Sequence, residues 1–183
     1  DTEQRFINEF TVSSTNTLNP FSNSQQRQFL RKVNKIISLL KLKNGILHFQ
    51  VKFYQEQIKI IEVTRRIPGD QYLKFVETAT GYPVIENIIN IYLGIKPKSL
   101  ASKRYYVLRK VVMADKNGCI KKIIINNQIR RYMIWRYDVK NSGNHVKDYL
   151  NERIAILIFK FKTKKELAHS TKFIDQLVNV SMK

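Results

Sequence analysis

Two short stretches of alternating residues, joined by a polar turn, shape the first half of the chain. Residues 46–53 alternate apolar and polar side chains, and residues 58–64 are rich in isoleucine and valine. A repeat of two is typical of strands with one buried face, because successive side chains of a strand point to opposite sides. The polar turn at 54–57 predicts that these two strands pair as an antiparallel hairpin.

Helices are predicted on both sides of this hairpin. In the first of them, apolar residues recur at helical spacing and basic residues occupy the other face. Asp70 supplies an N-cap for the helix that follows the hairpin, and Gly81 closes that helix. Thr163 and Glu166 form a capping-box pattern that opens the last helix. The predicted helices are 24–43, 71–80, 84–93 and 163–177.

The second half of the chain is predicted to be mostly β, with a tight turn at 116–118 between the first two strands. At the N-terminus, residues 5–13 predict a short edge strand and residues 13–23, rich in Ser, Thr and Asn, a loop. Residues 95–103 indicate a connector. The fold class is therefore α+β, an antiparallel sheet with packed helices. The further predicted strands are 105–114, 119–125, 132–139, 153–161 and 178–182.

Composition argues against disordered, disulfide-rich and membrane-spanning classes of protein. The 43% hydrophobic content argues against disorder, and Cys119 as a lone cysteine excludes an internal disulfide framework and a cysteine-based zinc site. No apolar run approaches the roughly 20 residues that span a bilayer, and the polar N-terminus lacks the pattern of a signal peptide. We expect a soluble cytoplasmic protein without a membrane partner and, since the chain lacks a starting Met, a piece of a longer one.

Charge is the dominant global property, because 33 Lys and Arg residues against 14 Asp and Glu residues give a net charge of +19. Such a field attracts phosphate-bearing partners such as nucleotides or nucleic acid. The alternative is a Lys-rich composition spread over a solvated surface. Trp135 and its tyrosine neighbours offer either a base-stacking surface or ordinary core packing.

Polar side chains gather at one end of the predicted hairpin. Glu62 and Thr64 point the same way, Arg66 continues their spacing, and Gln50 can face them from the partner strand. Hard oxygen ligands suit Mg²⁺, which binds one or two carboxylates together with substrate phosphates. A guanidinium beside them suits a transferring phosphoryl group. This pattern is typical of nucleotide phosphate activation, although each residue on spacing alone also fits a solvated surface, with Glu62 in an exposed ion pair.

At these positions residues 29–94 resemble the ATP-grasp superfamily of carboxylate–amine ligases, as in the amino-acid and dipeptide ligases. The matching elements are the Glu62-x-Thr64-x-Arg66 strand, the Gly69–Asp70 loop, the helix closing at Ala79–Gly81 and the helix closing at Leu93–Gly94. The resemblance implies the C-terminal part of an ATP-grasp domain in 1–95 and a small β-rich C-terminal domain in 96–183.

The resemblance also implies roles for individual residues. Arg66 would contact the ATP phosphates and the acyl-phosphate intermediate as the catalytic residue. Glu62 would hold Mg²⁺ with Gln50 and Thr64, ATP being the co-substrate of a small-molecule carboxylate and an amine. Residues that line or shape the substrate pocket would be His48, Gly69 and Asp70.

Two positions depart from the family pattern. Gln50 stands where a metal-binding Glu is typical, and Thr64 stands where Asn is typical. The lid that holds ATP and the N-terminal domains of the family have no counterpart in this chain, so we expect the fragment alone to be inactive. The alternative function is a non-catalytic basic module that binds nucleic acid or another anionic partner, favoured by Gln50 and by the +19 charge.

Overall fold

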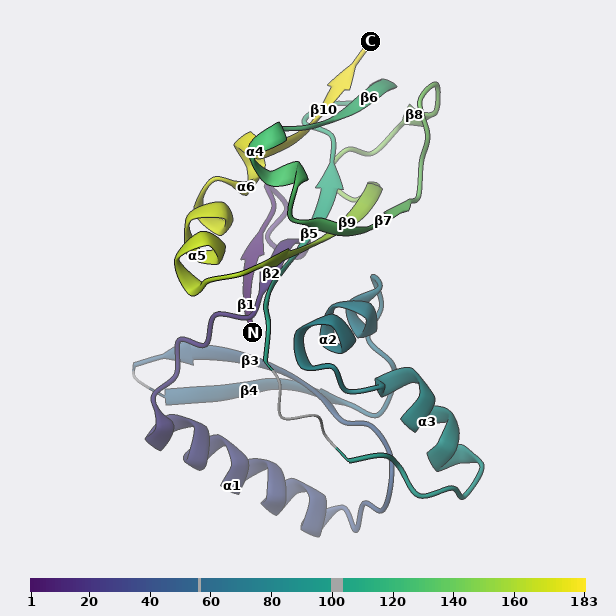
Figure 1. The fold of residues 1–183 in the computed structure, drawn as a ribbon. Helices are drawn as coiled ribbons and strands as arrows, with labels where there is room; N and C mark the ends of the chain where they lie inside the picture. Colours follow the sequence, from purple (N-terminus) through teal and green to yellow (C-terminus); the bar gives the residue numbers. More distant parts are fainter. Residues whose placement is uncertain (56, 100–103) are drawn as a thin grey trace. The chain divides into compact units, whose positions relative to one another are not determined.

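The computed structural model describes residues 1–55, 57–99 and 104–183 (Figure 1). The turn predicted at 54–57 includes Glu56, and the predicted connector 95–103 includes residues 100–103, so both predictions lie partly outside the described residues. The chain divides into two compact units, which we call the first and the second unit. The first unit comprises 1–19, 74–81 and 101–183, and the second comprises 20–73 and 82–100.

A five-stranded antiparallel sheet forms the centre of the first unit. Its strands follow the order β1-β2-β5-β9-β7, so that β5 and β9 are flanked on both sides. Burial on both faces favours apolar side chains, and β9 is apolar from Ile154 to Phe159, whereas β5 also carries Arg109 and Lys110, which are both almost fully buried. The strands are β1 (Thr2–Arg5), β2 (Val12–Asn16), β5 (Tyr106–Met113), β7 (Met133–Asp138) and β9 (Arg153–Phe161).

The N-terminal prediction was wrong in detail. A single strand was expected over 5–13 and a loop from residue 13, whereas two strands, β1 and β2, pair with each other and β2 also pairs with β5. Ser13, Ser14 and Thr15 are almost fully buried in β2. Their polar composition predicts a loop. However, β2 pairs with β1 on one side and with β5 on the other, and the hydrogen bonds of this pairing override the local preference.

A second, smaller sheet has the strand order β10-β6-β8. Its strands are β6 (Gly118–Ile125), β8 (His145–Val146) and β10 (Val178–Met182). Residues 116–118 lead from β5 into β6, but these two strands belong to different sheets and do not pair. A tight turn between consecutive strands usually makes a hairpin. Here β6 pairs with β10 and β8 instead.

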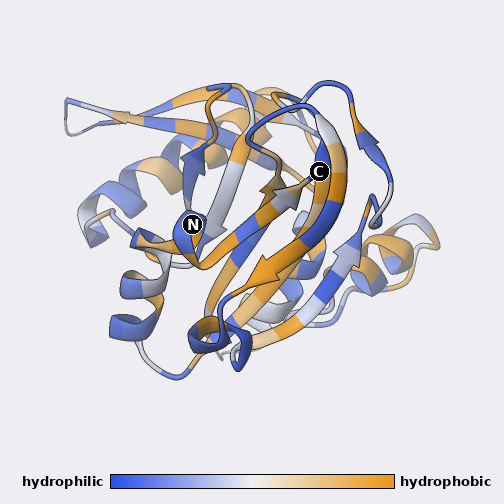
Figure 2. Ribbon diagram, turned by 90° about the horizontal axis from the view of Figure 1, so that it is seen from above, coloured by the Kyte–Doolittle hydropathy of each residue, from blue (hydrophilic) through white to orange (hydrophobic). Residues whose placement is uncertain are grey.

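The hydrophobic core of the first unit joins residues of both sheets to residues of the short helices. Leu157 and Phe159 of β9 and Leu167 of α5 are fully buried within it. Figure 2 shows long orange, hydrophobic stretches on the strands of the sheet. The helices are α4 (Asn127–Arg130), α5 (Lys164–Lys172) and α6 (Ile174–Leu177).

The C-terminal helical segment begins where the sequence predicts. Thr163 and Glu166 form the expected capping box, in which each side chain bonds the other residue's backbone N–H. One helix to residue 177 was predicted, but the segment breaks at Phe173, which has φ of −113° and separates α5 from α6. The β-branched and aromatic residues around the break have lower helix propensity than the residues before them.

The second unit is a hairpin with helices. Strands β3 (His48–Tyr54) and β4 (Gln57–Thr64) pair antiparallel, as predicted. Helix α1 (Asn23–Leu39) packs on one face of the hairpin, where the rings of Phe29 and Phe49 meet edge to face with centroids 5.6 Å apart. Ser22 caps α1 with Gln25 in a reciprocal capping box, and α3 (Val84–Tyr92) follows the hairpin later in the chain.

The two units interleave along the chain. Helix α2 (Tyr72–Thr80) starts in the range of the second unit and continues in the range of the first. The backbone N–H of Tyr105 donates to the carbonyl of Ala79 at 2.9 Å, which ties the end of α2 to the segment before β5. This grouping differs from a division between residues 95 and 96, since residues 1–19 join the later strands through the pairing of β2 with β5.

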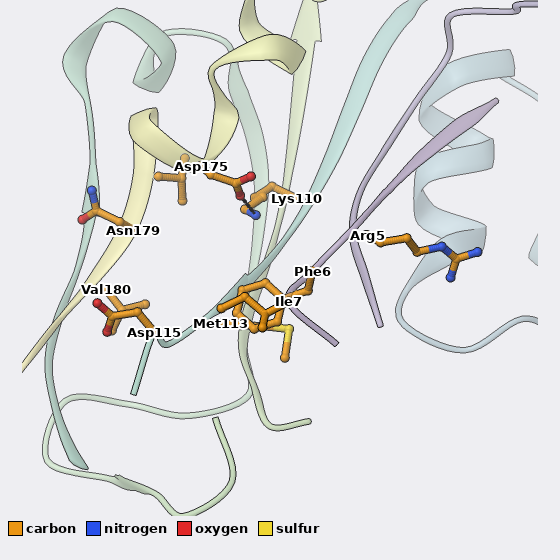
Figure 3. Close-up of a pocket in the computed structure, with 10 residues that line it drawn as sticks. Arg5, Phe6, Ile7, Lys110, Met113, Asp115, Asp175, Asn179 and Val180 are labelled. Carbon is orange, nitrogen blue, oxygen red and sulfur yellow. Dashed lines mark hydrogen bonds and ion pairs between the residues drawn. The ribbon is translucent and has the colours of Figure 1, made fainter. Parts of the chain in front are cut away.

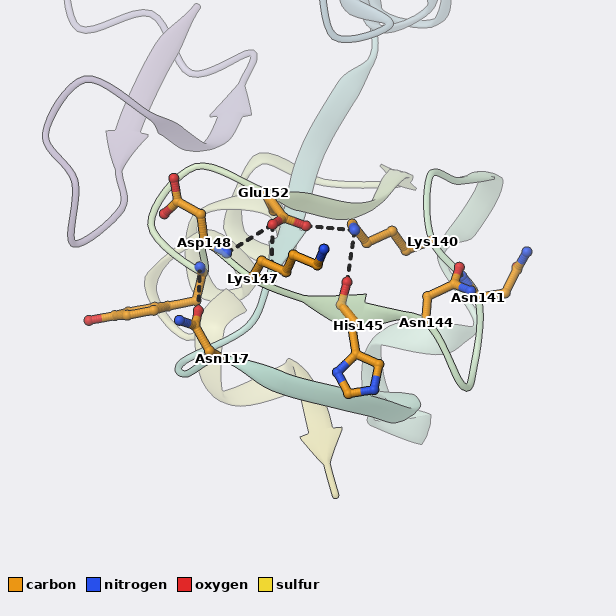
Figure 4. A network of polar contacts seen from close by, with 9 residues as sticks. Asn117, Lys140, Asn141, Asn144, His145, Lys147, Asp148 and Glu152 are labelled. Carbon is orange, nitrogen blue, oxygen red and sulfur yellow. Dashed lines mark hydrogen bonds and ion pairs between the residues drawn. The ribbon is translucent and has the colours of Figure 1, made fainter.

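Glu152 organises the loop that joins β8 to β9 (Figure 4). Its carboxylate accepts the backbone N–H groups of Lys147 and Asp148 at 2.9 and 2.8 Å, and its other oxygen lies 2.6 Å from Nζ of Lys140. The Lys140 ammonium, followed by the two N–H donors, lowers the pKa of Glu152 from 4.5 to about 2. The folded protein therefore favours the ionised form of Glu152 over the protonated form.

This shift predicts part of the acid sensitivity of the fold. A depressed folded-state pKa stabilises the protein above the unfolded value of 4.5, and that stability is lost as the pH falls toward about 2. Glu152→Gln should therefore lower the melting temperature at neutral pH and flatten its decline over this acidic range. Thermal melts against pH, with the exposed Glu9→Gln as control, measure both effects. Parallel curves for Glu152→Gln and the unmutated chain would contradict the assignment.

Candidate functional site

The hairpin places four of the candidate residues on one face. Gln50 lies directly opposite Glu62, and His48 lies directly opposite Thr64. Directly opposed residues of an antiparallel pair share a face, and so do residues two apart on one strand. His48, Gln50, Glu62 and Thr64 therefore form two neighbouring pairs on the face away from α1, which we call the polar face.

A β-bulge keeps this face polar. The pairing shifts between Gln50 and Val51, so that Val51 pairs with Ile60 and Ile61 is the extra residue. Without the extra residue, Ile60 would share the face of Glu62. With it, Ile58 and Ile60 turn to the side of Val51 and face α1, while Ile61 is 61% exposed. Bulges re-aim side chains in this way next to functional sites.

The oxygen donors of the polar face differ in exposure. Glu62 is exposed, whereas Gln50 and Thr64 are half-buried. The hydroxyl oxygen of Thr64 is buried and has no hydrogen-bond partner among the described residues. An unsatisfied buried hydroxyl costs free energy, so a hydrogen-bond partner for this oxygen would stabilise the hairpin.

His48 lies at the end of the polar face that is nearest in sequence to the loop after β4. The rings of His48 and Tyr72 meet edge to face with centroids 5.8 Å apart. In the loop, Asp70 and Gln71 both have left-handed backbone conformations, with φ of 61° and 55°. Asp70 therefore does not have the extended backbone of a typical N-cap, and such strained residues cluster at ligand-binding sites. A Cβ at Gly69 would meet no atom within 4 Å, so this loop is open there.

Arg66 lies beyond the last residue of β4 and is exposed. Its Nη1 donates to the carbonyl of Ile67 at 3.5 Å. Among the described residues no ion pair joins Arg66 to Glu62, nor does one join Glu62 to Lys52 or Arg65. The structure thus brings the four strand residues together and leaves Arg66 as a solvated neighbour in the chain.

A pair of lysines extends the polar face, and the sequence reasoning missed it. Lys52 and Lys59 lie directly opposite each other, one pair further along the hairpin than Gln50 and Glu62. Like charges in this arrangement repel and destabilise a hairpin. Lys59 donates to the side chain of Gln57 at 2.7 Å, and both lysines are exposed. Strand alternation predicts that Lys52 shares the face of Gln50, two residues before it. Lys59 lies on that face only because the bulge shifts the pairing of β4.

The donor set is compatible with one hard cation. In the described part of the chain no group of three His, Cys, Asp or Glu side chains could enclose a metal ion by itself. The polar face offers one carboxylate, one amide and one unsatisfied hydroxyl. Mg²⁺ is commonly bound by one or two carboxylates with the remaining positions filled by water and substrate phosphates, so the residues present fit a metal that arrives with a nucleotide.

Trp135 and Tyr137 form a second feature that the sequence singles out. They occupy alternate positions on β7, at the edge of the large sheet, and their rings stack with centroids 6.1 Å apart and an interplanar angle of 9°. Tyr137 is 46% exposed.

None of the helices in the described part of the chain has the length and apolarity needed to cross a membrane.

Comparison with known proteins identifies the fold. No protein-family model and no curated protein matches the sequence. Among solved structures, phosphoribosylglycinamide synthetase from Anaerococcus prevotii superposes with a TM-score of 0.80 at 17% identity over 99% of this chain. The L-amino acid ligase from Bacillus licheniformis gives 0.79 at 14% over 95%, and a biotin carboxylase–ATP complex from Campylobacter jejuni gives 0.71 at 13% over 98%.

The chain spans less than half the length of these proteins, 48%, 45% and 41% respectively. The matched region is the C-terminal part of each. The predicted resemblance is therefore confirmed at the level of the fold. This chain is a mixed helix and antiparallel-sheet protein with the fold of the C-terminal part of ATP-grasp carboxylate–amine ligases.

Proposed function

We propose that this chain is the C-terminal part of a ligase that uses ATP to activate a carboxylate and joins it to an amine. The observation that carries the proposal is the polar face of the hairpin. On it, the Gln50–Glu62 and His48–Thr64 pairs supply oxygen donors beside the Lys52–Lys59 pair, which forms no ion pair with a carboxylate among the described residues. The fold shared with a phosphoribosylglycinamide synthetase and an L-amino acid ligase supports the same class of reaction.

Glu62 is the proposed anchor for Mg²⁺, with Gln50 and Thr64 as neutral oxygen donors. An Mg²⁺ ion held by these residues would offset the negative charge of the nucleotide phosphates. The exposed carboxylate of Glu62 can reach a metal carried by ATP, and the buried hydroxyl of Thr64 gains a partner for its unsatisfied oxygen. Because Gln50 adds no charge, the site supports one firmly held cation.

Lys52, Lys59 and Arg66 are the proposed partners of the nucleotide phosphates. Two residues along a strand cover about 7 Å, so lysine side chains of the neighbouring pair can reach an anion held beside Glu62. An anion between Lys52 and Lys59 would remove the repulsion of their direct opposition. Arg66 is the proposed catalytic residue, stabilising charge on the transferring phosphoryl group and on the acyl phosphate.

The chemistry proceeds in two steps. A substrate carboxylate oxygen attacks the γ-phosphorus of ATP, which yields an acyl phosphate and ADP. The amine then attacks the acyl carbon and expels inorganic phosphate. His48 and the open loop at Gly69 and Asp70 are the proposed borders of the substrate pocket, and the rest of the nucleotide clamp would come from N-terminal domains of a longer protein.

Binding of Mg²⁺–ATP tests the proposal on the chain itself. Mg²⁺–ATP should raise its melting temperature, and Glu62→Gln should weaken the apparent affinity at least tenfold, since a charged metal contact is lost. Glu86→Gln removes the same charge from an exposed ion pair with Lys98 and serves as the matched control. In a protein that includes the N-terminal domains, Glu62→Ala and Arg66→Ala should each abolish ATP-dependent ligation. Full activity in both variants would refute the assignment.

A second candidate function is binding of single-stranded nucleic acid. It is favoured by the stacked, partly exposed Trp135–Tyr137 pair on an edge strand and by the net charge of +19. Base stacking on aromatic rings and neutralised phosphates would both contribute. Stabilisation by a DNA oligomer that falls steeply with salt, together with no response to Mg²⁺–ATP, would favour this candidate over the ligase.

A further inference from the structure

A cavity of about 570 Å³ is lined entirely by residues of the first unit, whereas the hairpin belongs to the second unit. This volume is within the range of about 300–1,000 Å³ that is typical of small-molecule sites. It is lined by the end of β1 and the segment after it, by the second half of β5 and the turn that follows, and by α6 and β10 (Figure 3). The apolar wall residues are Phe6, Ile7, Met113, Val178 and Val180.

A buried lysine stands at this cavity. The side chain of Lys110 is only 4% exposed, and its Nζ donates to Ser13 Oγ at 3.2 Å and forms an ion pair with Asp175 (Figure 3). An ammonium group has three N–H donors, and these two contacts leave one of them for a ligand. Burial lowers the pKa of Lys110, while Asp175 opposes that shift. Lys110 is therefore an incompletely satisfied cation beside an apolar wall.

Two carboxylates complete the polar lining. Asp175 is 69% exposed although it pairs with Lys110. Asp115 also lines the cavity and forms no ion pair among the described residues. The guanidinium of Arg5 is paired with Glu3 at 3.2 Å and lies away from the other labelled side chains in Figure 3. Both signs of charge are thus present, with two cationic side chains and two carboxylates in the lining, of which Asp115 alone forms no ion pair among the described residues.

We propose that this cavity binds a zwitterionic α-amino acid with an apolar side chain. The ligand carboxylate would accept the remaining N–H of Lys110, and its ammonium group would face Asp115 and the exposed carboxylate of Asp175. Its side chain would pack on Phe6 and Met113. A simple amine would leave Lys110 unsatisfied and be repelled by the net charge of +19. A simple carboxylate would be repelled by the two aspartates.

Three related probes test the charge pattern directly. L-Phenylalanine carries both charged groups, 2-phenylethylamine lacks the carboxylate, and 3-phenylpropanoate lacks the ammonium group. Calorimetric titration of the chain should show L-phenylalanine binding at least tenfold more tightly than either analogue, as expected for charged hydrogen bonds. Equal binding of either analogue, or no binding of L-phenylalanine, overturns the proposal.

Variants locate the site. Asp115→Asn should weaken L-phenylalanine binding about tenfold, and because Asp115 is exposed this variant should keep the fold. Lys110→Met should abolish binding, with circular dichroism reporting whether the fold is retained. Glu86→Gln makes the same charge change in the second unit and should leave binding unaltered. Unchanged affinity in Asp115→Asn contradicts the site. The outcome is independent of Mg²⁺–ATP binding, which involves Glu62.

Discussion

Phe159→Ala should lower the free energy of unfolding by about 3–5 kcal/mol, the usual cost of emptying a phenylalanine site in a core. Phe159 is fully buried on β9 and pairs with Leu108 of β5 on one side and Met133 of β7 on the other. Truncation removes apolar contacts within the core that joins the sheet to the helices. Neighbouring strands hold the backbone in place, so the cavity cannot collapse fully.

Urea denaturation monitored by circular dichroism measures this loss. Ile134→Ala on the neighbouring edge strand is the matched control, because Ile134 is 52% exposed. Exposed substitutions usually change stability by about 0.5 kcal/mol or less. If Phe159→Ala cost no more than Ile134→Ala, the placement of β9 at the centre of the sheet would be wrong.

Gln50→Glu should have opposite effects without and with Mg²⁺. It places a second carboxylate directly opposite Glu62, and like charges at directly opposed positions destabilise a hairpin by about 0.2–1 kcal/mol. With Mg²⁺ present the two carboxylates become a stronger ligand pair. We therefore expect a lower melting temperature in chelator and an affinity for Mg²⁺ at least tenfold higher than that of the unmutated chain.

Melting temperatures measured against Mg²⁺ concentration, with Ca²⁺ as a second ion, test this expectation. Gln28→Glu introduces the same change on the exposed surface of α1 and should show neither effect. A variant whose stability is equally insensitive to chelator and to Mg²⁺ would argue that Gln50 and Glu62 do not form a metal-binding pair. Introducing Glu62→Gln into the Gln50→Glu background should cancel the gain.

Much of the local structure is predictable from short-range patterns. The strand 153–161 was predicted at the residues where β9 is found, because a nine-residue run of mostly branched and aromatic side chains fits a central strand. The capping box at Thr163 and Glu166 was also predicted, since its two hydrogen bonds join residues three apart. Alternation along the two strands predicted that Gln50 can face Glu62 and Thr64, and the pairing register places Gln50 directly opposite Glu62.

The misses concern contacts between distant residues. Polar Ser13 and Ser14 became an interior strand because β1 and β5 provide hydrogen-bond partners on both sides. The bulge at Ile61 has no signature in an isoleucine-rich run, and it brings Lys59 to the face of Glu62. The pairing of Lys110 with Asp175 joins residues 65 positions apart.

Side-chain spacing and capping chemistry within a few residues of sequence predicted most of the longer helices and strands, but not the strand β2 or the break at Phe173, and they indicated that Gln50 can face Glu62 and Thr64. The order of the strands, the parity of the hairpin faces after the bulge and the burial of Lys110 beside a cavity were decided only by tertiary packing. The physical reason is that local patterns act through one chain segment's own backbone. Strand order and burial instead depend on which distant segments satisfy each other's hydrogen bonds and apolar surface.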